Sequence, residues 1–550
     1  MKLRGVRFLA LVLLVCPCAW ALTIQAEKAR IATAGKRIQG GWNLFTNGRV
    51  GDFVRFAKAG NYTVVVRAHG SPARGVWPNM TVLLDGGSRG GADVATKEPT
   101  DYTFRIEIPA GAHAIAVAFT NDALVGGEDR NLYLHRIDIR APEGTPDPAL
   151  ADRKELTVAA QKQEESVVER ARADIEKHRK ADAVVRVVDA EGTPVANAAV
   201  AIELARHEFL FGCNIYRFGR YKTAERNEAY KRRFRELFNA ATLPFYWRGY
   251  ERERGKPNYG NTDTMIAWCQ EHGIRMKGHP LLWGHQAGRP TWTDDKQPSP
   301  EIQKQRVTEI VRRFSGKIEF WEVVNEPSHC REVAIDQPYR WARAADPEAY
   351  LIVNDYYVMA NGYPPFFKLL EKAIKDGVPF DGIGIQAHEP RTMRFPLEKV
   401  QQTLDRYATL GRELHITEFT PCSAGQPITG SHIQGKWDEA AQADYATKFY
   451  TVCFAHPAVR AVTWWDLCDD GSWLKGGGML RADLTPKPVY TELRKLIHET
   501  WHTRLEARTD AKGEVRFRGF FGAYIVEADG RKASVSLSKA GGRELIAALR

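Results

Sequence analysis

The spacing of hydrophobic and polar positions divides the chain into stretches of different architecture. Over residues 23–140, short β-branched and aromatic runs alternate with turns rich in Gly, Asn, Asp and Pro. This spacing is typical of an antiparallel β-sandwich, which we expect over residues 23–142. The clearest predicted strands are 62–68, 80–84, 102–108, 114–119 and 132–139.

The next stretch changes pattern twice. Residues 143–148 form a short Pro/Gly linker, and residues 149–180 are charged, rich in Ala and free of Pro and Gly. We therefore expect linker and helix over 143–182, with the helix exposed as a spacer between modules. Residues 183–206 return to a strand pattern around a turn at 189–192, which predicts a small β insert.

From residue 207 onward, the pattern repeats as strand, loop and helix. Eight strands alternating with helices predict a (β/α)8 TIM barrel over residues 207–500. The predicted strands are 208–213, 236–242, 274–282, 318–324, 349–354, 381–386, 413–418 and 459–466, and the predicted helices include 262–272, 300–314 and 439–454. Residues 501–550 are predicted to be a β-rich extension.

The first 21 residues fit a cleavable secretion leader, with three basic residues, an apolar run and a small-x-small site at Ala19–Ala21. We therefore expect a secreted or periplasmic protein without a membrane anchor. The formal net charge is +11, but no long basic run exists, so we expect no nucleic-acid partner. Of the eight cysteines, six follow the leader and none has metal-ligand spacing; their pairing stays open. We expect a monomer.

Two glutamates stand at the carboxyl ends of predicted strands. Glu326 lies in Trp-Glu-Val-Val-Asn-Glu-Pro, where Pro327 ends the fourth barrel strand, and Glu418 ends the seventh in Ile-Thr-Glu. Barrels carry their chemistry at this end. Two carboxylates placed there are what glycosidic cleavage needs, one as proton donor and one as nucleophile or base.

These two motifs resemble those of glycoside hydrolase family 10, mainly retaining endo-β-1,4-xylanases on a (β/α)8 barrel. The resemblance covers residues 209–497 and implies that Glu326 is the acid/base and Glu418 the nucleophile, without a cofactor for catalysis. Other strand ends match the family's sugar-contacting positions: His279, Trp283, Asn325, Gln386, His388, Trp465 and Trp473. Asn354, Asp355 and Tyr356 match a further motif, which we interpret as structural support.

Two positions depart from the family pattern. After strand two, the family usually has Glu, Asn and Lys side chains that hold the second sugar, whereas this chain has only Thr242, Leu243, Pro244, Phe245, Tyr246 and Trp247. We expect Phe245, Tyr246 and Trp247 to offer stacking instead, which puts plain xylan as the substrate in doubt. In addition, Thr420 replaces an Asp, so His388 loses a charged partner and the pH profile should differ.

The N-terminal stretch carries a second candidate site. Its Phe-Thr-Asn-Asp and Asp-Arg-Asn-Leu motifs resemble calcium-dependent xylan-binding modules of families 36 and 60. Asp122, Asp129 and Asn131 would supply the oxygen ligands that Ca²⁺ prefers. An Asx-rich turn that needs no metal is the alternative.

The sequence thus predicts a secreted retaining β-glycanase acting on xylan or a related plant polysaccharide. Two alternatives stay open. One is a barrel hydrolase for another β-linked glycan, and the other is a carbohydrate-binding protein that lacks activity.

Overall fold

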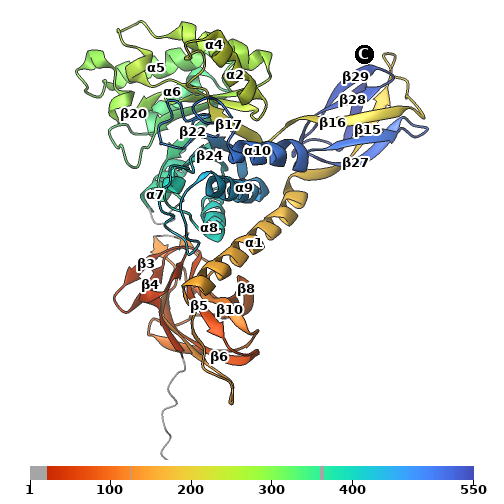
Figure 1. Ribbon diagram of the computed structural model, residues 1–550. Helices are drawn as coiled ribbons and strands as arrows, with labels where there is room; N and C mark the ends of the chain where they lie inside the picture. The colour runs from red at the N-terminus through yellow and green to blue at the C-terminus, as the bar shows by residue number, and fades with distance from the viewer. Residues whose placement is uncertain (1–21, 126, 360–363) are drawn as a thin grey trace, which may run out of the picture. The chain divides into compact units, whose positions relative to one another are not determined.

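The computed structural model describes residues 22–125, 127–359 and 364–550 (Figure 1). The chain forms two compact units, one up to Asp152 and the other from Arg153 to Arg550. The predicted leader, residues 1–21, lies outside the described residues. None of the described helices has both the length and the apolar composition that a membrane crossing requires.

The N-terminal unit is built from two antiparallel sheets, as the alternating pattern predicted. One has the order β3-β4-β13-β6-β9 with β1 beside β13, and the other β14-β5-β10-β7-β8 with β2 beside β5. Their inward-facing side chains, such as Val64, Val66, Val82 and Val117, form one buried core. The strands are β1 (Leu22–Gln25), β2 (Ile31–Ala32), β3 (Lys36–Ile38), β4 (Gly41–Leu44), β5 (Gly48–Phe56), β6 (Gly60–Ser71), β7 (Asn79–Leu84), β8 (Gly87–Asp93), β9 (Thr100–Ile108), β10 (Gly111–Phe119), β11 (Leu124–Val125), β12 (Glu128–Asp129), β13 (Asn131–Arg140) and β14 (Ala149–Leu150).

All eight predicted barrel strands are present in the second unit. They pair in parallel and close into a ring, because β17 bonds to both β18 and β25 and β19 bonds to β21. The strands are β17 (Leu210–Asn214), β18 (Ala240–Pro244), β19 (Arg275–His279), β21 (Phe320–Asn325), β22 (Tyr350–Asp355), β23 (Gly382–Ala387), β24 (Glu413–Phe419) and β25 (Val459–Trp464), with the two-residue β20 (Leu282–Trp283) beside the end of β21.

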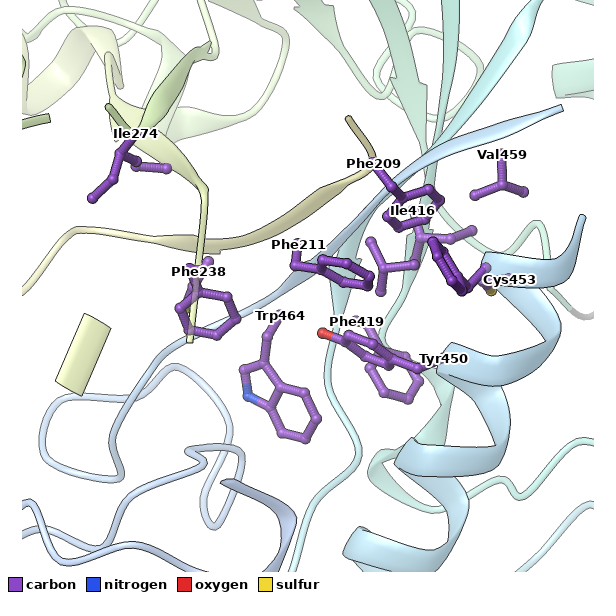
Figure 2. Close-up of a cluster of buried hydrophobic side chains, with 14 of the residues drawn as sticks. Phe209, Phe211, Phe238, Ile274, Ile416, Phe419, Tyr450, Cys453, Val459 and Trp464 are labelled. Carbon is purple, nitrogen blue, oxygen red and sulfur yellow. The ribbon is translucent and has the colours of Figure 1, made fainter. Parts of the chain in front are cut away.

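Helices follow the strands and bury apolar faces against them. Figure 2 shows Tyr450 and Cys453 facing strand residues such as Ile416 and Phe419. The helices are α2 (Ala224–Arg235), α3 (Trp247–Tyr250), α4 (Tyr259–Glu271), α5 (Pro300–Arg313), α6 (Asp336–Ala345), α7 (Pro364–Lys375), α8 (Leu397–Ala408), α9 (Glu439–Ala455) and α10 (Pro488–Lys495). Capping residues determine where several helices begin. Asp438 accepts a hydrogen bond from Ala441 N at the beginning of α9, and Pro300 occupies the first turn of α5.

Helix α1 (Arg153–His178) differs from the predicted exposed spacer. It packs against α8 and α9, and Val167, Ala171 and Ile175 are buried. In its middle, the buried carboxylate of Glu164 accepts two hydrogen bonds from Arg394, at 3.1 and 2.6 Å. The partner that buries this face lies about 230 residues further along the chain, so local composition did not reveal it.

The predicted β insert and C-terminal extension form a single two-sheet sandwich. Strand β15 (Lys180–Val188) lies between β27 and β30, while β16 (Ala199–His207) lies in the other sheet, ordered β26-β16-β28-β29. The turn at residues 189–192 is present, with Gly192 at a φ of 84°, but it does not join a hairpin because β15 and β16 belong to different sheets. The remaining strands are β26 (Arg504–Arg508), β27 (Glu514–Phe520), β28 (Gly522–Ala528), β29 (Arg531–Leu537) and β30 (Glu544–Ala548).

The cysteines form no disulfides among the described residues. The six thiols at Cys213, Cys269, Cys330, Cys422, Cys453 and Cys468 are free, and only Cys330 is partly exposed. The large apolar core of this unit stabilises it without covalent cross-links.

Candidate active site

One cavity of about 630 Å³ opens at the carboxyl ends of the barrel strands. All nine barrel residues predicted from the motifs line it: His279, Trp283, Asn325, Glu326, Gln386, His388, Glu418, Trp465 and Trp473. They come from strands β19 to β25, far apart in sequence, and parallel closure brings their ends together. The structure thus gathers the predicted set, while the role of each residue stays a prediction.

Glu326 directly follows β21, where its backbone adopts a φ of 56°. Such left-handed backbone costs a non-glycine residue about 1–3 kcal/mol and persists only where the surroundings hold it. Here the Glu326 amide donates to Asn354 O at 2.8 Å, and its carbonyl accepts from Cys330 N at 2.7 Å. These two bonds aim the Glu326 side chain into the cavity.

The Glu326 carboxyl accepts two side-chain hydrogen bonds. Trp283 Nε1 donates to Oε2 at 2.9 Å, and Gln386 Nε2 donates to Oε1 at 3.0 Å. Burial raises the pKa of Glu326 to about 7, and the negative charge of Glu418 adds to the effect. Glu326 is therefore protonated below neutral pH, as a general acid requires.

The Glu418 carboxylate is held by two side chains. Asn354 Nδ2 donates to Oε1 at 3.0 Å, and His388 Nε2 lies 2.9 Å from Oε2. The other ring nitrogen of His388 lies 2.9 Å from the Thr420 hydroxyl. Thr420 therefore takes the place of the missing Asp as the partner of His388. Its neutral hydroxyl orients the His388 ring without adding charge.

Asn354 does more than the structural support predicted for its motif. Besides Glu418, its amide donates to Asn325 Oδ1 at 2.9 Å, and its own Oδ1 accepts from Thr417 Oγ1 at 2.5 Å. Gly384 on the neighbouring strand leaves the space for it, because a Cβ there would lie 2.6 Å from Asn354 Oδ1. One buried amide therefore connects the ends of three strands at Glu418.

A network of buried charged and polar side chains lies beside the cavity. The fully buried Glu322 accepts from Lys277 Nζ and pairs with His279 Nδ1, while His279 Nε2 lies 3.1 Å from the Tyr246 hydroxyl. Burial alone would raise the pKa of Glu322, but the positive charge of Lys277 and the hydrogen bonds with Lys277 and His279 hold that pKa low. The side-chain atoms of His279, Glu322 and Glu418 that could bind a metal ion lie within 4.8 Å of one another. However, the Lys277 ammonium already neutralises Glu322. We therefore assign no metal here.

The loop after strand two corrects part of the sequence analysis. Phe245 and Trp247 were expected to stack on sugar, but both are buried in the core, with 0% and 1% exposure. Trp247 Nε1 donates to Glu251, and the Arg306 guanidinium covers the Trp247 ring. Only Tyr246 reaches the cavity. The strand ends at Pro244 and α3 begins at Trp247, so the three consecutive side chains leave the backbone in different directions and do not all face the substrate.

Asp466 and Tyr216 also line the cavity, and the sequence analysis missed both. Asp466 directly follows Trp465 at the end of the eighth strand, and Tyr216 follows the first strand. A polar residue directly after a barrel strand was the available signal for Asp466. Tyr216 gave no comparable signal, because an isolated Tyr is more often packed in a core.

The predicted calcium ligands flank the short β11–β12 pair in the N-terminal unit: Asp122 precedes β11, Asp129 ends β12 and Asn131 begins β13. Asn131 is 7% exposed, its Nδ2 donates to Asp129 O, and its Oδ1 accepts no hydrogen bond from any residue that the structure describes. Asp122 is positioned through its backbone amide, which donates to Asn47 Oδ1 at 2.8 Å. Two carboxylates and a buried amide oxygen are hard oxygen ligands, so these residues fit Ca²⁺. Bound there, the ion would order this loop and could coordinate sugar hydroxyls.

Comparisons with known families agree with this geometry. Residues 202–496 match the model of glycosyl hydrolase family 10. Residues 63–150 match a model described as a Ca-dependent, xylan-binding carbohydrate-binding module. The second match contains all three predicted calcium ligands.

Relatives and solved structures are similar to parts of the chain. Endo-1,4-beta-xylanase B of Thermotoga neapolitana is 31% identical over 280 residues, which is 46% of this chain and 78% of that protein. The anti-sigma-I factor RsgI6 of Acetivibrio thermocellus is 27% identical over 371 residues, and this chain spans only 46% of its length. Native xylanase 10B of Thermotoga maritima is 26% identical, with a TM-score of 0.46, over 53% of this chain and 96% of that one. Because the family model covers more than half of the sequence, this chain belongs to glycosyl hydrolase family 10.

Proposed function

We propose that this glycoside hydrolase is a retaining endo-β-1,4-xylanase that uses a double displacement. Glu418 attacks the anomeric carbon while Glu326 donates its proton to the departing glycosidic oxygen. Glu326, now ionised, then takes a proton from water, which attacks the glycosyl-Glu418 ester and restores both carboxyls. The sugar thus keeps its β configuration. The two carboxyls should lie about 5–5.5 Å apart, the separation that retention requires.

One observation carries this assignment: the two carboxyls differ in pKa shift and in hydrogen-bond partners. Glu326 is half-buried, and its loss of solvation raises its pKa to about 7, which keeps its proton available. Glu418 accepts from the Asn354 amide and pairs with His388, an arrangement that orients an ionised nucleophile. Carboxyls in such contrasting surroundings take the acid and the nucleophile roles.

Three further features support xylan or a related polysaccharide as the substrate. The name of the Thermotoga neapolitana relative and the description of the N-terminal module both refer to xylan. The sequence of the first 21 residues supports export to the periplasm or the medium, where such a polymer is encountered. We propose that the enzyme acts there as a monomer, without nucleic acid or membrane anchor.

The loop after strand two favours a second candidate, hydrolysis of a substituted or different β-glycan. Tyr246 offers one phenol where the family usually has three polar groups. Fewer hydrogen bonds to the second sugar would weaken binding of plain xylan and tolerate a decorated chain better. Comparing kcat/KM on linear and substituted xylo-oligosaccharides distinguishes the two candidates.

Replacing each glutamate tests the mechanism. Glu418→Ala should abolish turnover even of aryl glycosides with activated leaving groups. Glu326→Ala should still cleave those substrates, and azide should restore turnover and yield a β-glycosyl azide, because azide needs no base. Glu413→Ala, at the opposite end of the same strand as Glu418, is the matched control and should retain activity.

Three results would contradict the proposal. They are the α-anomer as the first product of the wild-type enzyme, no azide rescue of Glu326→Ala, or sugar binding without hydrolysis of any β-glycan. The last result would favour a carbohydrate-binding protein.

A further inference from the structure

Asp466 is an additional carboxyl in the cavity, beyond the two assigned to chemistry. It is 8% exposed and has a φ of 72°, a backbone conformation that suits glycine and strains aspartate. Burial also raises its pKa, so the folded chain bears a cost for keeping an acid there. Strain and burial combined at a cavity wall indicate a functional constraint rather than a requirement of the fold.

The Asp466 side chain is held in place by two hydrogen bonds, but its capacity to accept hydrogen bonds is not filled. Its Oδ1 accepts from Asn214 Nδ2 at 3.1 Å, and its Oδ2 accepts from the Trp473 backbone amide at 2.8 Å. A carboxylate accepts about four hydrogen bonds, so further positions remain for a ligand.

Tyr216 provides a donor on the adjacent strand end. Its ring contacts Trp465 and Tyr246 edge-on, with centroids 5.4 and 5.8 Å away. Its buried hydroxyl makes no well-formed hydrogen bond among the described residues, although it interacts with the Tyr246 hydroxyl. A buried hydroxyl whose hydrogen bonding is incomplete costs free energy that a bound ligand would recover.

The order of the barrel strands places both residues on one side of the scissile bond. Glu326 follows β21, and its partner Gln386 lies on β23, so the leaving group that Glu326 protonates sits along that arc. Asp466 and Tyr216 follow β25 and β17, which are neighbours on the opposite arc. That arc faces the sugar that becomes attached to the enzyme, the glycone.

We propose that Tyr216 and Asp466 form a specificity pair that binds neighbouring hydroxyls of a glycone sugar. The Tyr216 hydroxyl donates to one sugar oxygen, and the Asp466 carboxylate accepts from an adjacent hydroxyl. A neutral pyranose with a free vicinal diol fits this pair. The inference rests on the proposed function and adds the groups that recognise the glycone.

Glycine substitution separates a binding role from a structural one. Asp466→Gly removes the carboxylate and relieves the backbone strain, so its melting temperature should not fall. On an aryl β-xylobioside, its kcat/KM should fall about tenfold or more, the loss expected for a hydrogen bond to a charged group. Tyr216→Phe should lose about fivefold, because its bond is neutral.

Two matched variants control for backbone strain and for a buried phenol. Asp529→Gly makes the same change at an aspartate with a φ of 49° in the β28–β29 turn. Tyr450→Phe removes a buried hydroxyl that makes no hydrogen bond within the described part of the chain, in the apolar cluster of Figure 2. Both should keep kcat/KM within about twofold of wild type.

Binding measurements make the inference testable apart from hydrolysis. Calorimetric titration of xylobiose into Glu418→Ala should show weaker affinity when Tyr216→Phe or Asp466→Gly is added. Equal affinities, or a kcat/KM of Asp466→Gly equal to wild type, would overturn the inference. A wild-type enzyme that binds xylobiose through this pair but cleaves no β-glycan would contradict only the proposed function.

Discussion

Asn354 Nδ2 donates a hydrogen bond to Glu418 Oε1 at 3.0 Å. The same amide group also donates a hydrogen bond to Asn325 Oδ1, and its oxygen accepts one from Thr417. Only one orientation of the Asn354 amide satisfies all three contacts. The nucleophile is therefore held by a side chain whose own orientation is determined by the surrounding strands.

Asn354→Asp should slow hydrolysis without unfolding the barrel. The new carboxylate cannot donate to Glu418 and repels it, so we expect kcat to fall by about 10- to 100-fold, as for loss of a hydrogen bond to a charged group. Steady-state kinetics on an aryl β-xylobioside, with a melting curve as control, measure this. A kcat equal to wild type would show that Asn354 does not orient Glu418.

The pH dependence should follow Glu326. Because its pKa is raised to about 7, the protonated acid disappears above that pH, and kcat/KM should fall about tenfold per pH unit. A dinitrophenyl leaving group needs little protonation, so its profile should be flatter on the alkaline side. Profiles of the two substrates that decline equally would assign the alkaline limb to another group.

Glu389 should make stability depend on pH. Burial raises its pKa to about 7, and neither carboxyl oxygen accepts a hydrogen bond from another of the described residues. A carboxyl whose pKa is raised by folding contributes stability below its unfolded pKa, and this contribution is lost as pH rises through 7. Glu389→Gln should therefore stabilise the protein at pH 9 by on the order of 2 kcal/mol, without a gain at pH 4.

Urea unfolding of wild type and Glu389→Gln at both pH values measures this difference. Exposed Glu271→Gln is the control and should show no such pH dependence. Equal stabilities of wild type and Glu389→Gln at pH 9 would contradict a buried, destabilising charge.

The ion pair between Glu164 and Arg394 should anchor α1. Both side chains are almost fully buried, at 4% and 2% exposure, so Glu164→Gln leaves a buried guanidinium with only its second partner, Asp444. We expect unfolding to become easier by about 3 kcal/mol, the scale for breaking a buried pair. Lys256→Ala breaks an exposed pair with Glu253 and should cost less than about 1 kcal/mol. Similar losses for the two variants would indicate that α1 is only loosely attached.

Calcium should control glycan binding by the N-terminal unit. The full chain carrying Glu418→Ala, which cannot cleave, should be retarded by soluble xylan in an affinity gel more strongly with calcium than with a chelator. Asn131→Ala should remove that difference, because it deletes a buried amide oxygen to which none of the described residues donates. Retardation that is the same with calcium and chelator would exclude the ion from sugar binding.

The barrel and its strand ends were predictable because their signals are local. Buried parallel strands are continuous apolar runs, and Pro327 and the polar residues after each run mark where they end. Since parallel strands end on one side of a barrel, nine residues from distant motifs could be assigned to one site. The calcium ligands were proposed from motifs close together in the chain, and their role stays a prediction.

Other features were decided only by contacts distant in sequence. Helix α1 appears polar because its apolar stripe is narrow, yet α8 and α9 bury it and Arg394 pairs with its Glu164. Strands β15 and β16 needed β26 to β30, more than 290 residues later, to complete their sheets. Composition carries no information about such partners.

The sequence by itself determined which residues could do the chemistry, because residue type and strand-end position are local properties. The tertiary structure decided which of them face the cavity and in what state. It placed the Phe245 and Trp247 side chains in the core and the Tyr246 side chain in the cavity wall. It also buried Glu326 enough to raise its pKa and placed Asn354, Asp466 and Tyr216 around the site. Side-chain direction, desolvation and hydrogen-bond partners arise only when distant strands pack together, and no single stretch of sequence contains them.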